Sequence, residues 1–170
     1  ITGVDMEKSN GVVHTINRTL VPPAGDVVDI AIALADMGDD SEFTVLVSLL
    51  ASDTYSDIAT ALKDAENVTV FAPTDAAFGE ISEVIPTLTV DQMKTVLTYH
   101  AAPARVFSTE LVDGQVIGML SGETVKVNIS DSGVTLTDKS GAADAKIIQV
   151  NVHGSNGVIH VVDKVLIPTL

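Results

Sequence analysis

The feature that most constrains the fold of this chain is the stretch Asn67-Val68-Thr69-Val70-Phe71-Ala72-Pro73-Thr74-Asp75-Ala76-Ala77-Phe78. Residues 68–72 are nearly all apolar or β-branched, which predicts a strand that is buried on both faces. Pro73 has no N–H to give to a ladder, so we expect the strand to end there. Thr74 and Asp75 can accept hydrogen bonds from free backbone N–H groups and start a helix. We therefore expect Thr74 and Asp75 to be structural residues, and not catalytic ones.

The hydrophobic period differs between the two halves of the chain. Helical spacing predicts helices from Asp26 to about residue 38, over 43–50, from near residue 52 or 56, and over 90–99, the second opened by the acidic run 39–42. From residue 104 onward the pattern alternates, which predicts strands at 104–107, 115–120, 123–130, 133–138, 144–152 and 158–166. Helices followed by strands indicate an α+β fold.

Composition excludes several classes of partner. The formal net charge of -14 repels phosphate backbones, so we expect no nucleic-acid binding. No apolar run is long enough to span a bilayer, so we expect no membrane insertion. The absence of Trp and the aromatic content of 4% argue against a sugar-stacking face. Because 46% of the 170 residues are hydrophobic, the chain can fill one core.

The chain contains an internal repeat. Residues 9–22 match residues 155–168 with seven identities, and Ser155 lies 146 positions after Ser9. We interpret residues 1–22 as the closing hairpin of a preceding domain, with strands at 1–8 and 12–21, and residues 23–170 as a complete domain of a tandem array. The alternative is a chance similarity, since Asn-Gly between apolar residues is a common hairpin signal. An unpaired hairpin at residues 1–22 is also a candidate for self-association.

Three segments together resemble the signature of the fasciclin domain family. They are Thr69 to Phe78, the pair Tyr99-His100 after a helix, and the closing run from Gly157 to Pro168. The resemblance implies a wedge of two small β-sheets with several α-helices along one side. It also implies an extracellular adhesion or matrix role, tandem copies and no cofactor.

Tyr99 and His100 are the candidate partner-binding residues. The resemblance associates this Tyr-His motif with cell-surface receptor binding in animal members of the family. The alternative is structural, because a Tyr or His at a helix end commonly hydrogen-bonds neighbouring carbonyls.

Other polar residues favour structural interpretations. His160 lies in alternating strand sequence, where a lone His is most often a satisfied core group. His153 and His160 without a carboxylate at fixed spacing are a weak metal signal. The acids between Asp36 and Glu42 lack the ligand spacing of an EF-hand, although weak calcium binding there stays open. We expect no metal site.

Enzyme signatures such as G-x-S-x-G, H-E-x-x-H and the phosphate-binding glycine loops are missing. We predict a non-catalytic, extracellular adhesion or matrix module from a secreted or surface protein. Its partners would be cell-surface or matrix proteins or glycans, and neighbouring repeats. The alternative function is small-ligand or carbohydrate binding in a groove between the helices and the sheets.

Overall fold

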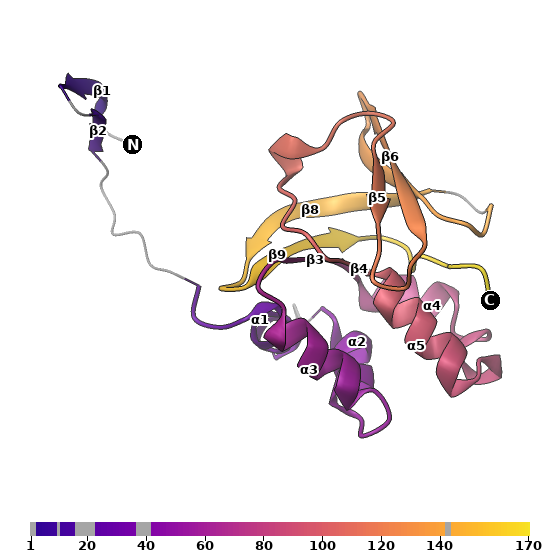
Figure 1. The fold of residues 1–170 in the computed structure, drawn as a ribbon. Helices are drawn as coiled ribbons and strands as arrows, with labels where there is room; N and C mark the ends of the chain where they lie inside the picture. The colour runs from indigo at the N-terminus through magenta and orange to yellow at the C-terminus, as the bar shows by residue number, and fades with distance from the viewer. Residues whose placement is uncertain (1–2, 10, 16–22, 37–41, 142–143) are drawn as a thin grey trace.

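Strand β3 (Val68–Pro73) lies between the helices and the strands β5 (Val116–Gly118) and β6 (Thr124–Ser130) (Figure 1). The computed structural model describes residues 3–9, 11–15, 23–36, 42–141 and 144–170. The helices are α1 (Val27–Ala35), α2 (Thr44–Ala51), α3 (Ser56–Asp64), α4 (Asp75–Glu80) and α5 (Val90–Tyr99), with short 3-10 turns η2 (Ile85–Thr87) and η3 (Ser108–Glu110). The strands are β1 (Gly3–Lys8), β2 (Gly11–Thr15), β3, β4 (Ala101–Ala102), β5 (Val116–Gly118), β6 (Thr124–Ser130), β7 (Gly133–Thr137), β8 (Ala145–His153) and β9 (Gly157–Val162). Helices α1, α2 and α3 precede β3 in the chain, and α4, α5 and strands β4 to β9 follow it. The α+β prediction is confirmed.

Seven strands follow one another in the order β4-β3-β9-β8-β7-β6-β5. The two sheets that we expected are joined through β8, whose residues Ala145 and Lys146 pair with β7 while residues 147–153 pair with β9. The pair β3–β9 is parallel, and the other pairs are antiparallel. The backbone N–H of Leu120 also donates to the Ala101 carbonyl at 2.7 Å, which brings the β5 end of the order back to β4.

Two hydrophobic clusters lie on opposite sides of the β3–β9 pair. Val68 and Ala72 face the cluster shared with the helices, whereas Phe71 faces the cluster enclosed by β5, β6 and β7. All six residues of β9 are buried. The alternation of a strand sends successive side chains to opposite faces, so β3 and β9 need apolar residues on both faces. This burial explains the near-continuous apolar sequence of residues 68–72.

The strand predicted at 104–107 is wrong. The Thr69 hydroxyl donates to the Ala104 carbonyl at 2.6 Å and accepts from the Val106 N–H at 2.9 Å. A ring nitrogen of His160 lies 2.9 Å from the Val106 carbonyl. Side chains therefore occupy the backbone groups that a ladder would need, and the strand at this point is the two-residue β4.

Hairpin β1–β2 forms a separate two-stranded sheet. Its pairs Gly3–Thr15, Met6–Val13 and Glu7–Val12 correspond, at the offset of 146, to Gln149–Val161, Val152–Ile159 and His153–Val158 in β8–β9. Both hairpins change register between the first and second of these pairs. Residues 1–2, 10 and 16–22 of the expected hairpin lie outside the described residues.

Candidate functional site

Tyr99 and His100 end helix α5 and lie in the interior. Tyr99 is 0% exposed, and its hydroxyl donates to the Thr124 carbonyl at 2.9 Å. Burial raises the pKa of Tyr99 to about 12, and the negative charges of Asp138 and Glu123 act in the same direction. The phenol is therefore a neutral link between the end of α5 and the start of β6.

His100 connects α5 to the segment that follows β9. It is 4% exposed, its Nδ1 lies 2.8 Å from the Val96 carbonyl, and its Nε2 accepts from the Leu166 N–H at 2.9 Å. The Leu166 N–H requires a lone pair on Nε2, which assigns the ring proton to Nδ1. Burial lowers the pKa of His100 to about 4, against a smaller effect of the Val96 carbonyl. The ring is neutral near pH 7.

Tyr99 and His100 are the residues for which the sequence analysis expected direct contact with a partner, and in this structure both lie in the interior. A partner surface cannot reach either side chain, because both are enclosed by protein atoms and their polar atoms bind the backbone. The contacts match the structural alternative for this motif.

Thr74 and Asp75 lie where β3 passes into α4, but they cap different helices. The Thr74 hydroxyl accepts from the Ala77 N–H at 3.1 Å, at the start of α4. The Asp75 carboxylate instead accepts from the N–H groups of Thr44 and Val45 at 3.1 and 2.9 Å. Asp75 thus caps α2, which sequence reasoning had assigned to the acidic run before it.

Phe43 explains why α2 needs a cap from elsewhere. It precedes the helix with φ of 70°, and no side chain at this position caps the helix. A left-handed conformation is costly for a bulky residue, and the ring is 1% exposed. Burial of the ring and the bonds from Asp75 hold this conformation in place.

His160 is a fully buried group of β9. Its Nδ1 accepts from the Asn151 N–H at 3.4 Å, and its Nε2 faces the Val106 carbonyl. The ring also stacks on Phe71 with a centroid distance of 5.7 Å. Burial lowers the pKa of His160, which favours the neutral ring, and both ring nitrogens have backbone partners.

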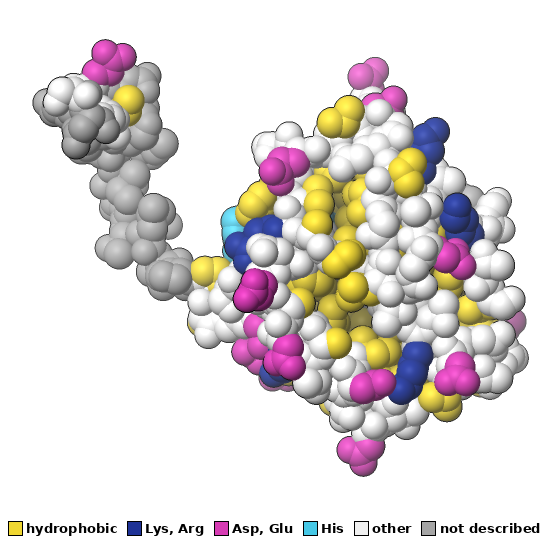
Figure 2. Space-filling view, in the orientation of Figure 1, with side chains coloured by type: hydrophobic (Ala, Val, Ile, Leu, Met, Phe, Trp, Pro, Cys, Tyr) yellow, Lys and Arg dark blue, Asp and Glu magenta, His cyan; other side chains and the backbone are white. Residues whose placement is uncertain are grey.

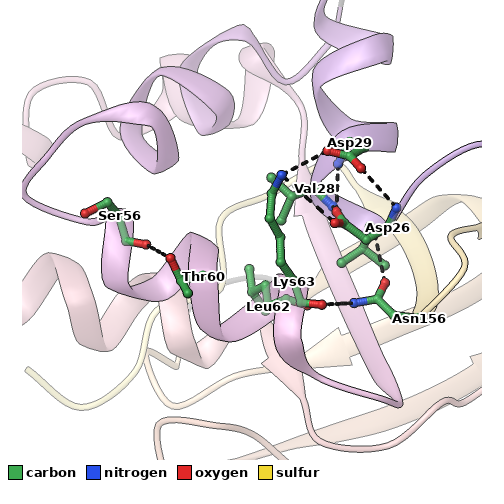
Figure 3. Close-up of polar contacts among 9 residues, drawn as sticks. Asp26, Val28, Asp29, Ser56, Thr60, Leu62, Lys63 and Asn156 are labelled. Carbon is green, nitrogen blue, oxygen red and sulfur yellow. Dashed lines mark hydrogen bonds and ion pairs between the residues drawn. The ribbon is translucent and has the colours of Figure 1, made fainter.

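Asn156, in the turn between β8 and β9, joins three parts of the chain (Figure 3). Its Oδ1 accepts from the Val27 N–H at 3.0 Å, at the start of α1. Its Nδ2 donates to the Leu62 carbonyl at 2.7 Å, at the end of α3. Beside it, Lys63 Nζ lies 2.9 Å from an Asp29 oxygen, and this hydrogen bond lowers the pKa of Asp29. The closing turn therefore holds two helix ends together.

Grooves between helices and strands are present among the described residues, and two of them are lined as follows. One, of about 240 Å³, is lined by α3, α5, Ala101 and Leu120, and Figure 2 shows apolar side chains in a hollowed strip on this side of the molecule. The second, of about 290 Å³, is lined by Leu34, Glu42, Phe43, Thr74, Ile148, Gln149 and Val161.

The described residues contain no group of three or more His, Asp or Glu placed to hold a metal ion. Asp39 and Asp40 lie outside those residues. In the described part of the chain, no helix combines the length and apolar character needed to cross a membrane.

Comparison with known proteins assigns the family. The profile of the fasciclin domain matches residues 41–168. The chain belongs to the fasciclin domain family. This fasciclin domain is 30% identical over 145 residues to Protein sll1483 of Synechocystis, covering 77% of each chain.

Longer relatives contain the same domain. The chain is 27% identical to the fasciclin-like arabinogalactan protein CTB11 of Cercospora beticola and 30% identical to human periostin, with 99% and 94% of this chain matched. It spans 41% and 18% of their respective lengths. A solved structure, a FAS1 domain pair from the insect cell adhesion molecule fasciclin I, has a TM-score of 0.51 and 20% identity, and the match covers 73% of this chain and 43% of that one. That likeness supports the fold.

Sequence reasoning missed two residues of this fasciclin domain. Asn156 belongs to the repeated Asn-Gly pair, and its repetition as Asn10 was a signal that its amide has a structural role. Arg105 was not singled out, and its Nη2 donates to the Ser155 carbonyl at 3.0 Å. No local pattern predicts a contact between residues that are 50 positions apart.

Proposed function

We propose that this chain is a non-catalytic, extracellular adhesion or matrix module from a secreted or surface protein, which binds protein or glycan partners. One observation supports the non-catalytic part above all. The polar side chains that the sequence singled out, Thr74, Asp75, Tyr99, His100 and His160, all hydrogen-bond to the backbone. A side chain that satisfies buried backbone groups is not free to move protons or attack a substrate.

The binding surface of such a module would consist of exposed residues and not of the Tyr-His motif. A solid-phase screen of the intact chain against matrix proteins, cell-surface proteins and a glycan array tests this. We expect at least one specific, saturable partner whose affinity is unchanged in Tyr99→Phe, because that change removes only a buried hydroxyl. Absence of any partner, or a loss of affinity in a Tyr99→Phe variant of verified fold, would reject this form of the proposal.

The alternative function is small-ligand or carbohydrate binding between helices and strands. The groove beside Phe43 and Gln149 favours it, because this groove lies between Leu34 at the end of α1, the segment before α2, and the β8–β9 pair. A thermal-shift screen with sugars and small amphiphiles would detect such a ligand. Replacement of the exposed Ile148 by Glu should then abolish the shift, whereas Ile129→Glu, an exposed site on β6, should not.

The tandem arrangement, with residues 1–22 closing a preceding copy and 23–170 forming a complete domain, is also proposed. The matching registers of β1–β2 and β8–β9 support it. The parent sequence should contain a counterpart of residues 69–78 located 146 positions earlier. A parent that lacks it would refute the arrangement.

In the isolated chain, residues 1–22 are the proposed point of self-association, since an isolated hairpin is only marginally stable. Sedimentation of the full chain beside a chain that starts at Gly25 tests this. Identical monomeric behaviour of the two would reject it.

A further inference from the structure

The start of the domain, at Gly25 to Val27, is held in place by the turn between β8 and β9. The Ser155 N–H donates to the Gly25 carbonyl at 2.9 Å, and Asn156 accepts from the Val27 N–H. Gly154 fits closely here, because a Cβ on it would lie 2.9 Å from the Val27 nitrogen. The chain is therefore fixed to the β8–β9 turn from Gly25 onward.

The segment after β9 is held at the other end, and Figure 1 shows the C-terminus far from the start of α1. The Leu166 N–H donates to His100, the Ile167 N–H to Asp138 at 2.7 Å, and the Thr169 N–H to Glu123 at 3.3 Å. Leu166 and Pro168 correspond to Leu20 and Pro22 in the repeat.

These two attachments leave little chain between consecutive domains. If residues 1–22 close a preceding domain built in the same way, that domain holds the chain up to about Pro22, and this one holds it from Gly25. Only Pro23 and Ala24 lie between them. Three residue steps span at most about 11 Å. Two bodies joined so closely must touch.

The surface beside Gly25 has unused binding capacity. Arg105 reaches the Ser155 carbonyl, but its Nε is buried and has no hydrogen-bond partner in the described part of the chain. The ion pairs among the described residues do not include Arg105, although the chain has 23 acids. Next to the same turn, the rings of Phe107 and His153 lie 5.4 Å apart, and His153 is exposed.

We propose that the preceding fasciclin-like domain docks on this surface. The docking surface consists of Arg105, Phe107, His153 and Ser155. The preceding domain would supply an oxygen acceptor to Arg105 and apolar surface to Phe107. Asp138 and Glu123 accept from the N–H groups of Ile167 and Thr169, so carboxylates lie beside the departing chain in this domain. A preceding domain built in the same way would carry oxygen acceptors beside its own last residues. Relative motion is the usual behaviour of linked domains, so a rigid pair is a distinctive outcome. The proposal rests on the proposed tandem arrangement.

The proposed contact can be tested with a tandem chain. In this chain, residues 1–168 are followed directly by residues 23–170. The junction Pro168–Pro23 reproduces Pro22–Pro23. Amide relaxation should give both bodies one rotational correlation time, as for a single particle of twice the mass. A matched chain with a long Gly-Ser spacer at the junction should give two shorter times. Equal times for the direct and spaced chains would overturn the proposal.

Variants in the second unit locate the contact. Arg105→Glu, or His153→Glu at an exposed position if the first variant does not fold, should restore independent tumbling. Lys126→Glu makes the same change of charge at an exposed site on β6 and should not. If Arg105→Glu or His153→Glu gave the same correlation times as Lys126→Glu, the assignment of the docking surface would be overturned. These readouts need no adhesion partner, so they are independent of whether the single chain binds one.

Discussion

The two hairpins of this chain, β1–β2 and β8–β9, share sequence and register but not surroundings. Strand β9 pairs with β8 on one edge and with β3 on the other, whereas β2 pairs with β1. Val158 of β9 is 0% exposed, and its counterpart Val12 is 54% exposed. The same residues are therefore core in one place and surface in the other.

This difference separates the residues that a hairpin needs in order to form from the residues that pack against the rest of a domain. The turn and the alternating pattern are sufficient for the hairpin itself. The glycine, the asparagine and the inward-facing valines acquire their roles only against a body that supplies a third strand and two helix ends. The proposed tandem arrangement would supply such surroundings to β1–β2 as well.

The largest contrast is expected at the glycine after the turn. A Cβ on Gly157 would lie 2.2 Å from the Val68 carbonyl oxygen, whereas one on Gly11 would meet nothing within 4 Å. Gly157→Ala should lower the free energy of unfolding by about 3 kcal/mol or more. Gly11→Ala should change it by less than about 0.5 kcal/mol. Urea denaturation measures both, and similar effects of the two would break the comparison.

Acid should lower the stability of the domain formed by residues 23–170, because the buried histidines among the described side chains lie in it. The pKa of His100 is about 4 when folded, below its ordinary value of 6.5. As the pH falls from 6.5 towards 4, the unfolded chain binds a proton that the folded chain does not, so stability decreases. Protonation of His100 in the unfolded chain should lower the free energy of unfolding by about 3 kcal/mol.

Urea unfolding followed across this pH range measures the loss. A His100→Gln variant should show a shallower decline, because the titrating imidazole is absent. His160, whose pKa burial also lowers, would continue to contribute. Parallel pH profiles for the two chains would contradict the assignment to His100.

A smaller contrast is expected at the valines that follow the turn glycines. Val158→Ala removes buried methyl groups and should cost about 2 kcal/mol. Val12→Ala changes an exposed side chain and should cost less than about 0.5 kcal/mol. In a longer parent chain, burial of Val12 by a preceding body would raise its cost towards that of Val158. Thermal unfolding of both variants, in this chain and in the longer parent chain, measures these costs.

The smallest effect on stability is expected where β3 passes into α4. Among the described strands, β3 is the pairing partner that β9 has and β2 does not. Asp75→Ala removes the cap of α2 and should cost about 1 kcal/mol. Asp91→Ala is the matched control, since Asp91 is an exposed acid in the first turn of α5, where Thr89 is the cap. Hydrogen exchange at the Thr44 and Val45 amides should increase in the first variant only. Unchanged exchange there would contradict the role of Asp75.

Local patterns predicted most of the elements. The helices, the strand at 68–72 and the hairpin strands follow from hydrophobic period, proline, caps and turn residues, which act over a few positions. The candidate site was less predictable. The Tyr-His motif was visible, but its burial depends on β5 and β6, which follow it in the chain.

The amino-acid order alone thus settled the α+β class, the position of the strand at 68–72 and the presence of two hairpins with matching sequence, because local backbone chemistry decides these. Packing decided that Asp75 caps α2, that Thr69 prevents a strand at 104–107, and that Asn156 joins two helices. Each of these bonds links groups at least 30 positions apart, and such groups meet only when the chain has folded.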